Sequence, residues 1–142
     1  MERNFIKLIK TIKKDMDVKL NQILSKVDVT CSQYYILAYL KEHKNETINQ
    51  KDIEEEFDLK NPTVTGLLDR LENKGYIERQ RSIEDSRRKN ILITKGALKK
   101  VSECDKALKE EFFDVVKKDF KEEEYDNLVE LLNIIDGNIK KV

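Results

Sequence analysis

The chain has 142 residues, of which 39% are hydrophobic and 39% are charged, and its formal net charge is zero. This length suits one domain with helical extensions, and the high charge is typical of long solvated helices. Because there is no apolar run of about 18 residues and no N-terminal signal-peptide pattern, we expect a cytoplasmic protein without a membrane span. The two cysteines fit neither a disulfide framework nor a metal-binding spacing.

The charges are segregated along the chain. Residues 60–100 carry eleven cations and five anions, a net charge of +6, whereas residues 103–136 carry five cations and twelve anions, a net charge of −7. A polyanion can bind the basic middle of such a chain while the acidic remainder stays solvated.

Apolar residues three and four positions apart predict a long first helix over residues 3–27. No proline or glycine interrupts this segment. The apolar stripe on so long a helix needs another apolar surface to pack against. The stripe consists of Phe5, Ile9, Ile12, Met16, Leu20, Ile23 and Val27.

The middle of the chain carries signals for three further helices. Thr30 and Gln33 form a capping box at the start of the second helix. A single strand is considered at Thr47-Ile48, and Asn49 caps the short helix that follows. Asn61 as N-cap and Pro62 as first helical residue start the next helix, and Gly75 ends it. Two short helices joined by a tight turn predict a helix-turn-helix.

Two strands, Tyr76–Arg81 and Lys89–Ile93, follow directly and enclose the loop of residues 82–88. A hairpin in this place is a wing. Thr94 is suited to cap a helix over residues 95–118, whose apolar stripe consists of Ala97, Val101, Cys104, Leu108, Phe112 and Val115. A last helix begins near Glu122 with a heptad-like apolar seam. The expected fold is mainly α with a small β-hairpin, a winged helix-turn-helix with helical extensions at both ends.

The outward face of the second short helix offers short polar side chains that suit base edges and phosphates. Gly66 permits close approach of DNA or tight packing against another helix, and Arg70 can reach DNA or form an ion pair with Asp69 or Glu72. The predicted DNA-binding residues of the helices are Ser32, Asn61, Thr63, Thr65, Gly66 and Arg70.

Cations on a narrow hairpin can enter a minor groove, whose negative potential attracts arginine. Asp85 can orient one guanidinium by bidentate pairing. Arg79 can touch a flanking phosphate or, alternatively, brace the wing. The predicted DNA-binding residues of the wing are Arg79, Arg81, Asp85, Arg87, Arg88 and Lys89.

These motifs together resemble the MarR family of bacterial transcription regulators. The resemblance rests on T-x-x-Q at Thr30, on PTVTGLLDRLENKGYIER from Pro62 to Arg79, on D-x-R at Asp85, and on I-T-x-G from Ile93 to Gly96. These motifs stand in the family's order and spacing, so the resemblance covers nearly the whole chain. Family members often carry a basic residue at the position of Gly66.

The resemblance implies a homodimer that binds double-stranded DNA, with residues 29–96 as the DNA-binding domain and residues 1–28 and 97–142 as the dimerisation region. It further implies a repressor of a pseudo-palindromic operator near its own gene. The residues expected in the dimer interface are Phe5, Ile9, Ile12, Tyr125, Leu128, Leu132, Ile135 and Ile139.

The resemblance also implies release from DNA by a small aromatic or lipophilic effector. A pocket for it is expected from Cys31, Tyr34, Tyr35, Tyr39 and His43, although the tyrosines can equally fill a junction between lobes. Cys31 lies in the first turn of a helix, where N–H groups can lower a thiol pKa. A cysteine-based redox regulator is therefore an alternative, and a buried packing residue is the plainer interpretation.

Other functional classes have less support in the sequence. The chain lacks a nucleophile elbow, a phosphate loop and a metal-ligand set, so we expect no enzyme, no cofactor and no metal. A winged-helix protein-interaction module without DNA binding is a further alternative. It predicts a wing poor in cations, whereas this wing is rich in them.

Overall fold

The computed structural model describes residues 1–81 and 89–142. Its elements are, in chain order, α1 (Glu2–Ser25), α2 (Cys31–Glu42), α3 (Gln50–Phe57), α4 (Asn61–Asn73), β1 (Ile77–Arg81), β2 (Lys89–Ile93), α5 (Lys95–Leu108), the π-helical segment η1 (Lys109–Phe113), α6 (Asp114–Val116) and α7 (Glu124–Lys140). The two strands pair antiparallel, with Ile77 opposite Ile93 and Arg81 opposite Lys89. The predicted mainly α fold with one small hairpin is confirmed.

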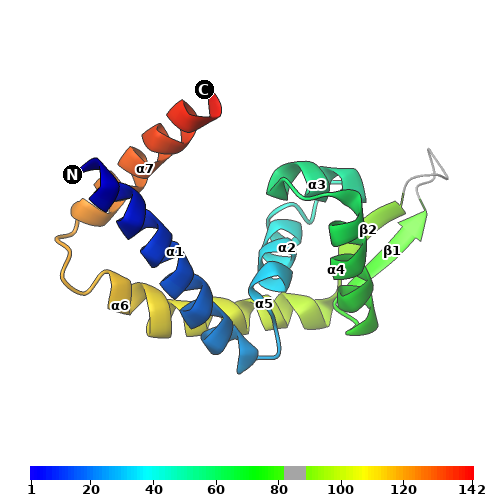
Figure 1. The fold of residues 1–142 in the computed structure, drawn as a ribbon. Coiled ribbons are helices and arrows are strands. Elements are labelled where there is room, and N and C mark those ends of the chain that lie inside the picture. The colour runs from blue at the N-terminus through cyan, green and yellow to red at the C-terminus, as the bar shows by residue number, and fades with distance from the viewer. Residues whose placement is uncertain (82–88) are drawn as a thin grey trace.

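The long helix α5 lies along the base of the molecule and joins its two ends (Figure 1). Helices α2, α3 and α4 and the hairpin gather at one end of α5, and α1 crosses it toward the other end, where α6 and α7 lie. The hairpin follows α4 directly and projects outward as a wing.

Local capping signals in the sequence operate as predicted. The Thr30 hydroxyl accepts a bond from the Gln33 backbone N–H at 3.1 Å, and the Gln33 side-chain oxygen accepts the Thr30 backbone N–H at 3.1 Å. The start of α4 differs, because Lys60 is the N-cap and Asn61 is already helical. The prediction of Asn61 as the cap was wrong, and its amide instead donates to Glu54 in α3.

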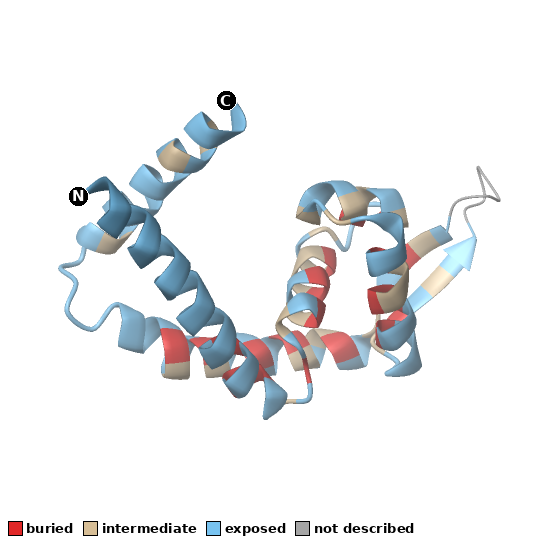
Figure 2. Ribbon diagram, viewed as in Figure 1, coloured by how far each residue is buried: buried red, intermediate tan, exposed pale blue. Residues whose placement is uncertain are grey.

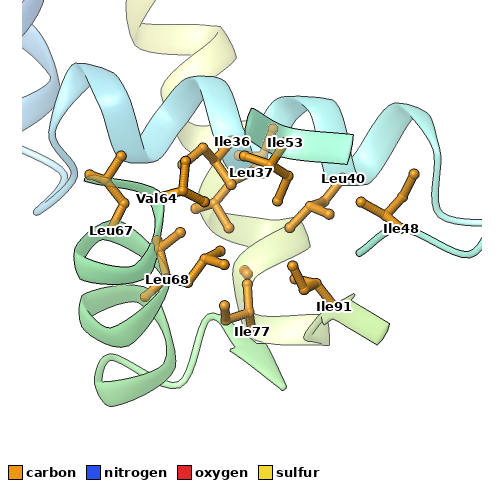
Figure 3. Close-up of a cluster of buried hydrophobic side chains, with 13 residues drawn as sticks. Ile36, Leu37, Leu40, Ile48, Ile53, Val64, Leu67, Leu68, Ile77 and Ile91 are labelled. Carbon is orange, nitrogen blue, oxygen red and sulfur yellow. The ribbon is translucent and has the colours of Figure 1, made fainter. Parts of the chain in front are cut away.

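A first core cluster, which we call the wing-side cluster, unites α2, α3, α4 and the hairpin (Figure 3). Its apolar side chains come from the inward faces of these elements because their periodicities match, about 3.6 residues on the helices and 2 on the strands. Helix α5 contributes Ala97 and Val101. The other members are Ile36, Leu37, Leu40, Ile48, Ile53, Val64, Leu67, Leu68, Leu71, Ile77 and Ile91.

A second core cluster, the α1-side cluster, joins the end of α1 and the start of α2 to the far part of the α5 helix. Its members are Leu20, Ile23, Leu24, Val29, Cys104, Leu108 and Phe112. One face of α5 therefore supplies both clusters, and the spacing of its buried residues agrees with the predicted stripe.

The helix predicted over residues 95–118 runs from α5 through η1 into α6 and ends at Val116. The π-helical segment changes the register of the apolar stripe, so Phe112 is buried while Val115, which was expected to continue the stripe, is exposed. The short strand considered at Ile48 does not form. Its carbonyl only accepts the Ile91 N–H at 2.8 Å, beside the hairpin.

Most residues of α1 and α7 are exposed (Figure 2), and many large apolar residues are among them. No residue of α7 is buried, and in α1 burial begins only at Leu20. Within the two described segments, none of the helices is long and apolar enough to cross a bilayer. The exposed apolar faces coincide with the stripes predicted to form a dimer interface.

Gly75 ends α4 in the left-handed region, with φ at +75°. The Tyr76 N–H bonds to the Leu71 carbonyl at 2.9 Å and the Gly75 N–H to the Glu72 carbonyl at 2.9 Å, which closes the helix end in a Schellman motif. The hairpin starts from this turn, so its direction depends on the backbone of Gly75.

We expect Gly75→Ala to lower the free energy of unfolding by about 1–2 kcal/mol, because a Cβ makes the left-handed conformation costly. A Cβ at Gly75 would meet no atom within 4 Å, so the backbone conformation alone is tested. Urea unfolding at fixed protein concentration measures the change. Gly96→Ala, at a helical glycine that is equally uncrowded, is the control and should leave stability unchanged or raise it. Equal losses in both variants would contradict the explanation.

Candidate nucleic-acid interface

Helices α3 and α4 form the predicted helix-turn-helix. Asn49 caps α3, with its side chain accepting the Asp52 N–H at 3.0 Å, and Asp58 ends α3 in the left-handed conformation at φ 50°. The turn of Asp58, Leu59 and Lys60 leads directly into α4. Asp58 is the residue that lets the chain reverse within three residues, and its role was not foreseen from the sequence.

Helix α4 divides into a buried and an exposed face, as predicted. Val64, Leu67, Leu68 and Leu71 pack into the wing-side cluster. The predicted DNA-binding residues lie on the opposite face, where Asn61, Thr63 and Arg70 are exposed and Thr65 and Gly66 are half-buried.

Two alternatives on this face can be compared with the structure. A Cβ at Gly66 would meet no atom within 4 Å, so no helix in the described part of the chain packs tightly there. Arg70 forms no ion pair with Asp69 or Glu72, because both carboxylates bond to Arg79 instead. Both Gly66 and Arg70 are therefore accessible on the outer face of α4.

Arg79 on β1 joins the wing to α4. Its Nη2 lies 2.7 Å from the Asp69 carboxylate, and its Nε and Nη2 lie 3.0 and 3.1 Å from the two oxygens of Glu72. The Arg79 side chain is only 19% exposed. These bonds are the bracing arrangement considered for Arg79, and they occupy the guanidinium with protein carboxylates rather than leaving it for phosphate.

The pairing shifts the acid–base behaviour of both partners. The hydrogen bond from Arg79 lowers the pKa of Glu72, and the bonds to Glu72 and Asp69 raise the pKa of Arg79 above its usual value. We call this set of Arg79, Asp69 and Glu72 the wing clamp. It fixes the hairpin against the C-terminal half of α4.

The outer end of the hairpin carries the cations predicted for the wing. Arg81 and Lys89 are paired residues of the ladder, and both are exposed. Asp85, Arg87 and Arg88 lie outside the described residues.

The remaining predicted DNA-binding residue, Ser32, is exposed in the first turn of α2. The neighbouring turn is tied to the end of α4 by Lys74, whose Nζ lies 2.8 Å from the Asp28 carbonyl oxygen and 3.3 Å from Gln33 Oε1. Lys74 was not singled out from the sequence. It connects the start of α2 with the end of α4, and it satisfies the buried Gln33.

The residues expected to form an effector pocket separate into two groups. Tyr39 lies against His43 with the two rings tilted and their centroids 4.4 Å apart, and it meets Phe57 edge-on at 5.8 Å. Tyr34 and Tyr35 lie beside each other near the α1-side cluster, and the Tyr34 hydroxyl donates to Asp105 of α5 at 2.5 Å. Tyr34 and Tyr35 thus meet other neighbours than Tyr39 and His43, and the effector pocket stays a prediction.

Cys31 packs, partly buried, against the α1-side cluster. Burial raises the pKa of Cys31 despite its place in the first turn of α2, and burial raises the pKa of Cys104 to about 11. Desolvation is the largest effect at Cys31, because charging a partly buried thiol is costly, and it exceeds the lowering by the hydrogen bond with Tyr35. Within the same described ranges, no three His, Cys, Asp or Glu side chains are grouped so as to hold a metal ion.

Sequence reasoning missed Gln50 and Glu54 on α3. The Gln50 amide donates to the Thr65 hydroxyl at 2.8 Å, and Glu54 accepts from the Asn61 amide at 3.0 Å. The two residues are four positions apart, so they lie on one face of α3. This spacing, on a helix that buries the neighbouring Ile53, was the signal in the sequence that both side chains could face the next helix.

The wing clamp predicts a specific pH dependence. A carboxyl whose folded pKa is lowered stabilises the fold above its unfolded pKa, and this contribution is lost as the pH falls through the folded pKa. The unperturbed value for Glu72 is 4.5. We expect Arg79→Met to lower the free energy of unfolding at neutral pH, and the difference from wild type to shrink as the pH falls below 4.5.

Urea unfolding at a series of pH values measures this difference. Arg81→Met removes a cation from the exposed end of the same strand and is the matched control, for which no such pH-dependent difference is expected. A loss in Arg79→Met that is the same at every pH would show that the clamp does not act through the Glu72 carboxylate.

Comparison with known proteins agrees with this geometry. The model of the family described as MarR family matches residues 27–88. The HTH-type transcriptional regulator SarZ of Staphylococcus haemolyticus is 30% identical over 131 residues, which are 92% of this chain and 86% of SarZ. The organic hydroperoxide resistance transcriptional regulator of Bacillus subtilis is 35% identical over 106 residues, which are 74% of this chain and 71% of that protein.

Among solved structures, MepR of S. aureus in a complex with DNA matches with a TM-score of 0.81 at 30% sequence identity, over 93% of this chain and 94% of MepR. The match covers α1 and α7 as well as the winged helix, since nearly the whole of both chains is included. On its fold and on the sequence of its relatives, this chain belongs to the MarR family, whose members are transcription regulators and not enzymes.

Proposed function

We propose that the protein is a homodimeric repressor that binds a pseudo-palindromic operator near its own gene and is released by a small aromatic or lipophilic effector. The observation that carries the proposal is the wing clamp beside the exposed face of α4. It presents a helix with short polar side chains and a cationic hairpin as one rigid surface, as reading a groove and its flank requires.

DNA binding is further supported by charge and by a relative. The segment of residues 60–100, which contains α4 and the hairpin, has a net charge of +6. Cations there gain affinity by displacing counterions from DNA phosphates. MepR, which this chain resembles over nearly its whole length, has been solved in complex with DNA.

The proposed dimer rests on the exposed apolar faces of α1 and α7. Leu128, Leu132 and Ile139 of α7 are 39%, 41% and 65% exposed in the single chain. The two helices also have opposite charges, because α1 carries six cations and three anions whereas α7 carries one cation and four anions. A second copy can therefore cover the apolar stripes and pair unlike charges at once.

A two-fold dimer explains the proposed form of the operator. Its two α4 helices are related by the symmetry axis, so they meet two inverted half-sites about one helical turn apart, roughly 34–36 Å. We assign residues 29–96 to DNA binding and residues 1–28 and 97–142 to dimerisation on this basis.

We propose a small-molecule effector rather than a redox signal because of the state of Cys31. Burial raises the pKa of this thiol, so the reactive thiolate is disfavoured at neutral pH. Tyr34 and Tyr35, with a ring-centroid distance of 5.7 Å, lie where α2 meets α5 and offer aromatic surface to a planar ligand. Release of bound DNA by aromatic acids, retained in Cys31→Ser, is the expected behaviour.

The proposed function is tested by fluorescence anisotropy with DNA from upstream of the protein's own gene and with scrambled DNA of equal length. We expect two subunits per site, a clear preference for the upstream DNA and a steep decrease of affinity with salt. Arg87→Ala should weaken specific binding by about 1–3 kcal/mol. Equal and weak binding of both DNAs would contradict an operator near the gene.

The dimer is tested by Leu132→Asp, which places a charge in the proposed apolar interface. We expect monomers in sedimentation equilibrium and an operator affinity lower by about 10²–10⁴-fold, because one half-site must then be bound without the other. Asn133→Asp adds the same charge on the polar face of α7 and should remain dimeric. Monomers with full operator affinity would refute the dimer requirement.

A further inference from the structure

Two side chains of α3 hold the first turn of α4. Glu54 accepts a hydrogen bond from Asn61 Nδ2 at 3.0 Å. Gln50 Nε2 donates to Thr65 Oγ1 at 2.8 Å and lies 3.4 Å from the Asn61 carbonyl oxygen. Both the side chain of Asn61 and the backbone that carries it are therefore fixed by α3.

The bonded groups face an open cavity of about 630 Å³ between α3, the start of α4 and the hairpin. Gln50, Glu54 and Asn61 line it together with Arg79 and Lys89. Asn61 is exposed, so a ligand that meets the start of α4 can reach the part of its amide that Glu54 leaves free.

The chemistry of an amide limits what Asn61 can read. A carboxamide recognises adenine in the major groove with one N–H to N7 and its oxygen to the N6 amino group. The Asn61 amide has two N–H groups, and the bond to Glu54 uses one of them. One N–H and the oxygen remain, which is the pair that adenine requires.

Glu54 also fixes which way the amide is turned. A carboxylate only accepts hydrogen bonds, so it favours the rotamer with the nitrogen toward α3 and disfavours the flipped one. Without this bond the two orientations of the Asn61 amide are nearly equal in energy. A base would then meet the amide oxygen in some molecules and the amide nitrogen in others at the same place. An amide held in one orientation pays less ordering entropy on binding.

We propose that Glu54 is a positioning residue for sequence recognition, which holds Asn61 for bidentate pairing with an adenine in each half-site. This inference rests on the proposed DNA-binding function. Glu54 acts on affinity and on selectivity in opposite directions. Its charge repels every DNA alike, whereas its bond to Asn61 affects one base pair.

The test compares operator DNA with variants in which each base pair is replaced in turn, using anisotropy on the full chain. We expect replacement of one A·T pair to weaken binding of the wild type by about 5- to 150-fold. The same replacement should have little effect on binding of Asn61→Ala. Glu54→Ala should lose most of this discrimination at the same pair, and should bind scrambled DNA as tightly as the wild type or more tightly.

Two control variants separate the bond from the charge. Glu54→Gln keeps a side chain of similar size without the charge. Because its amide can donate as well as accept, it no longer disfavours the flipped Asn61 amide and should lose part of the discrimination. Glu55→Ala removes an exposed charge from the same helix and should leave the discrimination unchanged while strengthening binding to scrambled DNA. In the double variant Glu54→Ala/Asn61→Ala, the loss should be no larger than in Asn61→Ala alone, because the two residues act as one unit.

The outcomes distinguish this inference from the function on which it rests. If the wild type prefers no DNA, the proposed function fails and the inference with it. If the wild type selects its operator but Glu54→Ala keeps full discrimination at the Asn61 pair, only the inference is overturned. A loss spread evenly over all base pairs, with an unchanged thermal unfolding curve, would likewise overturn it.

Discussion

The shared apolar face of α5 is the constraint on which the rest of the molecule depends. Ala97 and Val101 of α5 belong to the wing-side cluster, whereas Cys104 and Leu108 of α5 belong to the α1-side cluster, together with Phe112 of the following η1. Because one helix supplies side chains to both clusters and close-packed interiors transmit strain, a shift of α5 in one cluster also displaces residues in the other. The Tyr34 bond to Asp105 adds a polar link between α2 and the same helix.

Ionic and polar bonds hold the surface proposed to bind DNA, which is formed by α4 and the hairpin, in place on the apolar clusters. The wing clamp holds the hairpin to the C-terminal half of α4, while Gln50 and Glu54 hold its N-terminal turn. The two ends of α4 are thus fixed by different neighbours. Carboxylates near a surface proposed to meet DNA lower the affinity for DNA by charge repulsion. Here they orient other groups, because Asp69 and Glu72 hold the wing and Glu54 holds the Asn61 side chain.

Much of this fold follows from local sequence signals. The capping box at Thr30, the turn glycine Gly75 and the apolar periodicities fixed the order of the elements, because each signal acts within a few residues. The bonding partners were not predictable in the same way. Arg79 could be assigned to phosphate or to bracing from the sequence, since its carboxylates lie on another element and only the tertiary arrangement brings them within 3.0 Å.

The same limit applies to Asn61, to Cys31 and to the tyrosines of α2. Asn61 has the residue type of a helix cap, but tertiary bonding to Glu54 gave its amide another partner, and the helix began one residue earlier. For Cys31 the sequence left a reactive thiol and a packing residue open. The tertiary arrangement places it against the α1-side cluster, where burial raises its pKa. The predicted pocket residues share one helix, yet Tyr34 bonds to Asp105 whereas Tyr39 meets Phe57, and the sequence alone does not indicate these neighbours.

The apolar stripes left open on α1 and α7 have a consequence for control of gene expression. In the proposed function only the dimer binds the operator. At low abundance most chains are monomers, so the concentration of dimers rises with the square of the chain concentration. Folding stability also becomes dependent on concentration, because association stabilises only the folded chain. A repressor acting at its own gene would then switch within a narrow range of abundance, with that range set by how strongly α1 and α7 pair.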